Sequence, residues 1–134
     1  MNTKKRFKAL SLMEVLVTLV IIGILTLIAM PALMPLITSA KSLEAKVQLG
    51  HVLKMQKLYR YSHSKFSKDI NVIGYEQITL VDQGGNANYE ITIEQADLNS
   101  FQAKATSIVD FDGDGIFNVW VIDQDNRLEE IVPD

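Results

Sequence analysis

Three aspartates alternate with other residues late in the sequence, in a pattern that could hold a cation. Asp110, Asp112 and Asp114 are followed directly by Gly115. Alternating carboxylates can surround one small volume, and the glycine permits a sharp turn. Hard oxygen ligands in this number suit Ca²⁺. The stretch therefore predicts Ca²⁺ as a cofactor.

This pattern begins like an EF-hand loop and then departs from it. The twelfth position holds Val121, where an EF-hand needs a bidentate Glu, and the flanking residues have the pattern of strands. Completing the metal shell would require the carbonyl of Ile116 and the carboxylates of Asp123 or Asp125. The alternative is an acidic β-turn without metal, because Asp and Gly are favoured in turns for conformational reasons.

A single carboxylate, Glu14, lies near the start of a long apolar run. From Leu10 to Met30 only five residues are not strongly apolar. They are Glu14 itself, Ser11, Thr18, Gly23 and Thr26. A carboxylate costs about 2.5–3.5 kcal/mol at the centre of a membrane helix, less near the interface, and usually has a partner there. The alternative is an accidental acid at the membrane interface.

Other candidates for chemistry are weak. His51 and His63 lie twelve positions apart with no third ligand nearby, and Ser62-His63-Ser64 lacks an activating acid. The sequence has no cysteine and no phosphate-binding loop. We therefore expect that the protein is not an enzyme.

The apolar run is long enough to cross a membrane. It covers 21 residues, and a bilayer core of about 30 Å needs roughly 20 helical residues. An ordinary signal peptide has a shorter apolar region and a small-x-small cleavage site, which does not follow here. Residues 1–9 carry four basic side chains and no acid, which predicts a cytoplasmic N-terminus. A plain signal anchor remains an alternative.

A helical period continues beyond the apolar run. The period recurs at three and four in two series, which predicts one helix over about 10–63 whose second half is an amphipathic spine. The series are Leu36, Ala40, Leu43 and Val47, and then Leu49, Val52 or Leu53, Met55 and Tyr59. Pro31 and Pro35 should bend or loosen this helix. Residues 41–68 are basic. We interpret them as a solvated face rather than a nucleic-acid or lipid patch, so no nucleic acid is expected as a partner.

The period becomes two after about residue 70. Residues 78–81, 89–93, 101–109 and 116–122 read as short strands, and 128–132 adds an edge strand or trails along the surface. Short connections predict an antiparallel sheet, and the spine helix is its only available cover. Trp120 should anchor the sheet against this helix. The fold class is therefore α+β, with a long N-terminal helix packed on about four strands.

The segment KKRFKALSLMEVLVTLVIIGILTLIAMPALMP resembles the N-terminus of type IV pilins and of the pseudopilins of type II secretion systems. The charge of the leader, the position of the acid and the position of the proline all agree with those families. The resemblance implies a leader at 1–9, a transmembrane or filament-core helix at 10–35, and an extracytoplasmic head at 36–134, with its helix at 36–66 and its sheet at 70–134.

The resemblance also assigns roles to single residues. It implies cleavage by a prepilin peptidase between Ala9 and Leu10, although the families usually have Gly before the cut and Phe after it. N-methylation of Leu10 would follow. Glu14 would pair with the N-terminal amine of a neighbouring subunit, and Pro31 stands where the families have a helix-bending proline. An acid in a low dielectric costs much less beside a fixed cation.

The predicted function is that of a structural subunit in a homo-oligomeric or mixed filament of pilin-like proteins. Its partners would be the prepilin peptidase and an inner-membrane assembly platform with its ATPase. The protein would be a single-pass inner-membrane protein with a periplasmic head, or part of a cell-surface filament. We favour a pseudopilin over an adhesive pilus subunit because the head is small and free of cysteine. The alternative is a membrane-anchored Ca²⁺-binding module that does not polymerise.

Overall fold

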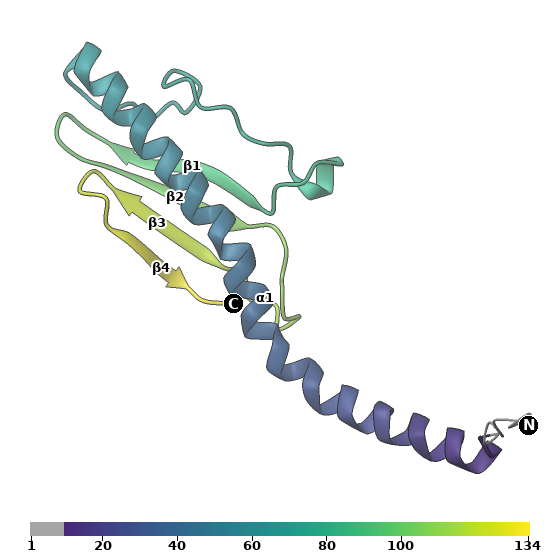
Figure 1. The fold of residues 1–134 in the computed structure, drawn as a ribbon. Coiled ribbons are helices and arrows are strands. Elements are labelled where there is room, and N and C mark those ends of the chain that lie inside the picture. The colour runs from purple at the N-terminus through teal and green to yellow at the C-terminus, as the bar shows by residue number, and fades with distance from the viewer. Residues whose placement is uncertain (1–9) are drawn as a thin grey trace, which may run out of the picture. The chain divides into compact units, whose positions relative to one another are not determined.

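The structure is a computed structural model that describes residues 10–134 (Figure 1). The predicted leader, including Ala9, lies outside the described residues. Contacts divide the chain between Met34 and Pro35 into two compact units. The first contains the apolar run, and the second, Pro35–Asp134, is the head.

The helix α1 spans Leu12–His63, which confirms the predicted long N-terminal helix. It ends at Ser64, which has a positive φ of 57° and donates its N–H to the carbonyl of Arg60 at 2.8 Å. Arg60 and His63 in the last turn favour this end electrostatically. The helix α1 continues through Pro31 and Pro35. The bend predicted at these prolines stays a prediction.

The four strands form an antiparallel meander in the order β1-β2-β3-β4. They are β1 (Tyr89–Ala96), β2 (Phe101–Ser107), β3 (Val119–Asp123) and β4 (Leu128–Val132). Figure 1 shows the part of α1 that follows Pro35 lying across one face of this sheet. The predicted α+β architecture, a long helix packed on a four-stranded antiparallel sheet, is confirmed.

Two strand predictions need correction. Residues 78–81 form no strand, and only an isolated bridge joins Leu80 to Ala87. A short 3-10 helix, η1 (Val81–Gln83), follows, and the chain turns back so tightly that a Cβ on Gly85 would lie 1.9 Å from the Thr79 carbonyl oxygen. The strand predicted at 116–122 begins only at Val119, because turns extend to residue 115. The edge strand at 128–132 is present as β4.

Of the two apolar series predicted on α1, the second, from Leu49 to Tyr59, packs on the sheet, and the first does not. Leu36, Leu43 and Val47, which we call the outer stripe, are 66%, 60% and 64% exposed. The buried face instead consists of small, aliphatic and amide side chains, namely Thr38, Ser42, Ala45, Gln48, Leu49, Val52, Leu53 and Gln56. Ala45, Leu49 and Val52 share a core with Tyr89 and Phe101. Helical period alone could not distinguish the two apolar faces.

The described part of the first unit is a helix segment whose exposed side chains are mostly apolar. An 18-residue window of α1 is long and apolar enough to cross a membrane, and none of that window is buried among the described residues. The hydroxyls of Thr18 and Thr26 donate to the carbonyls of Glu14 and Ile22, at 2.7 and 2.8 Å. Such bonds satisfy polar groups within the helix itself, as a lipid environment requires.

Candidate functional site

Glu14 is held in a capping box at the beginning of α1. Its carboxylate oxygen Oε2 accepts the backbone N–H of Ser11 at 2.8 Å, and the Ser11 hydroxyl accepts the N–H of Glu14 at 3.3 Å. This reciprocal arrangement satisfies two backbone donors that a helix start leaves unpaired. The S-x-x-E spacing was visible in the sequence, but the sequence interpretation missed the role of Ser11.

The capping box leaves the charge of Glu14 without a counter-ion among the described residues. Only the Ser11 N–H donates to its carboxylate there. Leu10, the predicted first residue after cleavage, is 78% exposed and directly precedes Ser11. The Glu14 carboxylate therefore binds the residue next to the predicted new N-terminus of its own chain. Its pairing with the N-terminal amine of a neighbouring subunit stays a prediction.

The second site is the acidic loop, residues 110–116, between β2 and β3. The carboxylate of Asp110 accepts the N–H groups of Gly113 and Gly115 at 2.6 and 2.7 Å. These bonds, that from Gly115 above all, lower the pKa of Asp110. The carboxylates of Asp112 and Asp114 accept the N–H groups two residues ahead, of Asp114 and Ile116. The aspartates thus shape the loop through its own backbone, as in an Asx-turn.

The carboxylates of Asp110, Asp112 and Asp134 converge. One oxygen from each lies within 4.8 Å of the others. Asp134 accepts the N–H of Phe111 through Oδ2 at 3.1 Å, whereas its Oδ1 is buried and has no hydrogen-bond partner among the described residues. A bond from the Asp114 N–H lowers the pKa of Asp112, but desolvation and neighbouring carboxylates outweigh it and the net pKa is raised.

The other predicted ligands lie elsewhere. Asp114 is not in the convergent group, and Asp123 and Asp125 belong to the β3–β4 turn. There the Asp123 carboxylate accepts the N–H groups of Asp125 and Arg127 at 2.8 and 3.0 Å. The length of β3, about 13 Å at 3.3 Å per residue, separates this turn from the acidic loop. The third carboxylate is Asp134, which no spacing rule could have linked to a loop some twenty residues earlier.

Residues 4–30 match the family model of the prokaryotic N-terminal methylation motif. The chain carries the type IV pilin and pseudopilin signature. The match includes Ala9, Leu10 and Glu14, and it supports a pilin-like subunit that is anchored in the membrane by its apolar helix. No curated protein matches the chain. The resemblance expected from the sequence is confirmed for residues 4–30.

Proposed function

We propose that the chain is a structural subunit of a type IV pilus-like filament, and more specifically a pseudopilin of a type II secretion system. One observation carries this proposal: the methylation motif coincides with an apolar helix whose side chains are exposed. A lone helix of this kind can be covered by lipid before assembly and by other copies after it.

The steps of the proposal follow from the motif. The chain inserts with its N-terminus in the cytoplasm and its head in the periplasm. A prepilin peptidase cuts between Ala9 and Leu10, and Leu10 becomes N-methylated. An inner-membrane platform with its ATPase then moves subunits into a filament that holds like or different pilin-like chains. The preference for a pseudopilin rests on the small, cysteine-free head.

Glu14 would supply the charge that fixes register between stacked helices. Its carboxylate is exposed at the first turn of α1, and among the described residues it accepts only one backbone N–H. The N-terminal amine of a neighbouring copy would neutralise it. A buried pair of this kind specifies alignment more than it adds stability.

The capping box favours a second candidate, a membrane-anchored Ca²⁺-binding module that does not polymerise. In that case Glu14 serves its own helix and needs no neighbour. Two substitutions separate the candidates. Glu14→Gln keeps a side chain that can complete the capping box and removes the charge. Ser11→Ala keeps the charge and removes the hydroxyl of the cap.

The filament proposal expects opposite results for the two variants. Glu14→Gln should abolish filaments in native membranes, because the ion pair is lost. Ser11→Ala should assemble at nearly normal yield, since it costs about 1 kcal/mol of helix capping. Native-length filaments from Glu14→Gln would contradict the pairing. Equal losses in both variants would mean that only the helix start matters.

We further propose that Asp110, Asp112 and Asp134 bind Ca²⁺. The residues fit such an ion because their three carboxylates converge and the buried Oδ1 of Asp134 lacks a donor. Bound Ca²⁺ would neutralise the mutual repulsion and tie the acidic loop to the residues after β4. The melting temperature of the head, residues 35–134, should rise with Ca²⁺ and fall in EDTA, and Asp134→Asn should reduce this difference. No difference between EDTA and excess Ca²⁺ would refute binding.

A further inference from the structure

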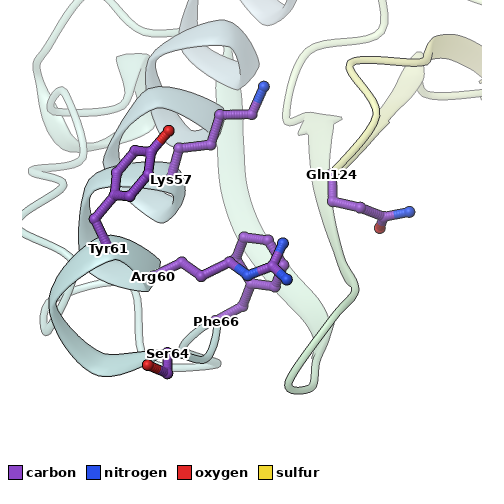
Figure 2. Close-up of a pocket in the computed structure, with 6 residues that line it drawn as sticks. All are labelled: Lys57, Arg60, Tyr61, Ser64, Phe66 and Gln124. Carbon is purple, nitrogen blue, oxygen red and sulfur yellow. The ribbon is translucent and has the colours of Figure 1, made fainter.

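A cationic cavity lies at the C-terminal end of α1. It has a volume of about 510 Å³ and is lined by Lys57, Arg60, Tyr61, Ser64, Phe66 and Gln124 (Figure 2). Lys57, Arg60 and Tyr61 stand at positions i, i+3 and i+4, so they share one helix face, and Ser64 directly follows the helix. Gln124 comes from the β3–β4 turn, on the opposite wall. We call this cavity the cationic pocket.

None of the residues that line the cationic pocket is acidic, although Asp125 of the same turn accepts the side-chain amide of Gln124 at 3.0 Å. Arg60 lies 4.9 Å above the Phe66 ring and donates to the Asn99 side-chain oxygen at 3.1 Å, which orients its guanidinium. Figure 2 shows Arg60 across Phe66, with Lys57 on the same side of the helix. Neither cation has an ion pair within residues 10–134, where Lys104–Glu94 is the one salt bridge. Two adjacent cations with a phenol hydroxyl suit a carboxylate ligand.

The acidic loop lies at the opposite end of the head. Asp134, which holds this loop, lines a separate cavity with Pro35 and Thr38 at the beginning of the head. Arg60 follows Thr38 by 22 residues of α1, a distance of about 33 Å along the helix. Asp112 and Asp114 are exposed at this end. The head therefore has a pocket lined by two cations at one end, beside Asp123 and Asp125 of the β3–β4 turn, and the acidic loop at the other end.

We propose that the cationic pocket of one copy binds the acidic loop of a second copy stacked on it. This inference rests on the proposed filament, in which all copies point the same way because each inserts with the same orientation. Parallel copies bring the distal end of one head against the proximal end of another. A head-to-tail contact between different surfaces does not close on itself, so it propagates along a filament. Opposite charges favour this contact, and like ends repel.

Cysteine cross-linking tests the contact directly, because the chain has no cysteine of its own. Tyr61→Cys and Asp114→Cys are introduced together into the full chain, and filaments are oxidised in the cells that make them. We expect disulfide-linked dimers and a ladder of higher species. The matched control combines Tyr61→Cys with Gln95→Cys, which is exposed on β1 and pairs with Gln102 towards the end of the sheet away from the loop. Equal cross-linking in both pairs would overturn the inference.

Charge exchange provides the second test. Lys57→Glu and Asp114→Lys should each reduce filament yield about fivefold, the effect of losing about 1 kcal/mol at one contact. The double variant should recover to within about twofold, since the attraction is restored with its sign reversed. Asp114 lies outside the convergent carboxylates, so this exchange does not remove a proposed Ca²⁺ ligand. A double variant no better than the worse single variant would refute the pairing.

The outcomes also separate this inference from the proposed function. Wild-type filaments without Tyr61–Asp114 cross-links would refute the head-to-tail contact and leave the filament proposal standing. A wild-type chain that forms no filament would overturn both. Cross-linking should weaken at high salt, because exposed charge pairs are screened. Cross-linking that is indifferent to salt and to charge reversal would contradict an electrostatic contact.

Discussion

Glu44 connects α1 to the beginning of β1 through one carboxylate. Oε1 accepts the backbone N–H of Asn88 at 2.8 Å, and Oε2 accepts the side-chain amide of Asn88 at 2.7 Å. Gln48 donates to the same carboxylate at 2.9 Å. In the sequence Glu44 is merely the one acid in a basic helix segment. No local pattern links it to a residue 44 positions later, so its role was not predicted.

Glu44→Ala should destabilise the head by about 3 kcal/mol, because it leaves partly buried donors without an acceptor. Denaturant unfolding of residues 35–134 measures this loss. The matched control is Glu90→Ala, an exposed acid on β1 for which we expect a change within about 0.5 kcal/mol. Equal effects of the two substitutions would contradict a specific role for Glu44.

Two buried tyrosines give the head a dependence on alkaline pH. Burial, followed by the charge of Glu44, raises the pKa of Tyr75 from 10.0 to about 12. The pKa of Tyr89 is raised by the same causes, with smaller contributions from Asp134 and Glu130. Their hydroxyls donate to Gln48 and Asn118 at 3.0 and 2.7 Å. The folded state therefore retains these protons at pH values where the unfolded chain has lost them.

The sign of the effect follows from linkage. A pKa that is higher in the folded state gives stability that is complete below about pH 10 and is lost as the pH rises towards 12. The free energy of unfolding of the head should decline over that interval, and Tyr75→Phe should make the decline shallower. Tyr61→Phe, an exposed control, should leave the slope unchanged. A slope that Tyr75→Phe does not alter would contradict the shifted pKa.

At the scale of elements, the sequence predicted the periods of the helix and the strands well and the buried face of α1 only from Leu49 onward. The long helix and three strand positions follow from hydrophobic spacing, so they were predictable. Which side of α1 meets the sheet before Leu49 was not predictable, because apolar residues occur on two sides there. The small residues Ser42 and Ala45 lie on the buried face, whereas Leu43 and Val47 point away from it. Residues 78–81 have a strand's composition, but the tight turn at Gly85 prevents pairing.

The outer stripe makes a prediction about α1. Val47 and Leu43 are exposed in the head, so Val47→Asp should change the melting temperature of residues 35–134 very little. If the stripe packs against other subunits, the same substitution should strongly reduce filament yield, since it places a charge in an apolar contact. The control is Lys54→Asp, also exposed on α1. Normal filaments from Val47→Asp would exclude the stripe from the assembly interface.

At the scale of the whole molecule, an apolar helix segment with the methylation motif precedes the folded head. The methylation motif is readable from the sequence because its charges and apolar residues are local. The sequence does not reveal that Asp110 converges with Asp134 or that the cationic pocket and the acidic loop lie at separate ends. Both depend on how the meander returns along α1. Assembly therefore has to be tested on the chain in its membrane.

The N-terminus of the protein isolated from the cells that make it tests the central claim most directly. Intact mass and N-terminal sequencing distinguish the possible mature chains. We expect a chain that begins at Leu10 and carries an N-methyl group. A chain that still begins at Met1 would contradict processing as a pilin-like subunit and would favour a plain membrane anchor.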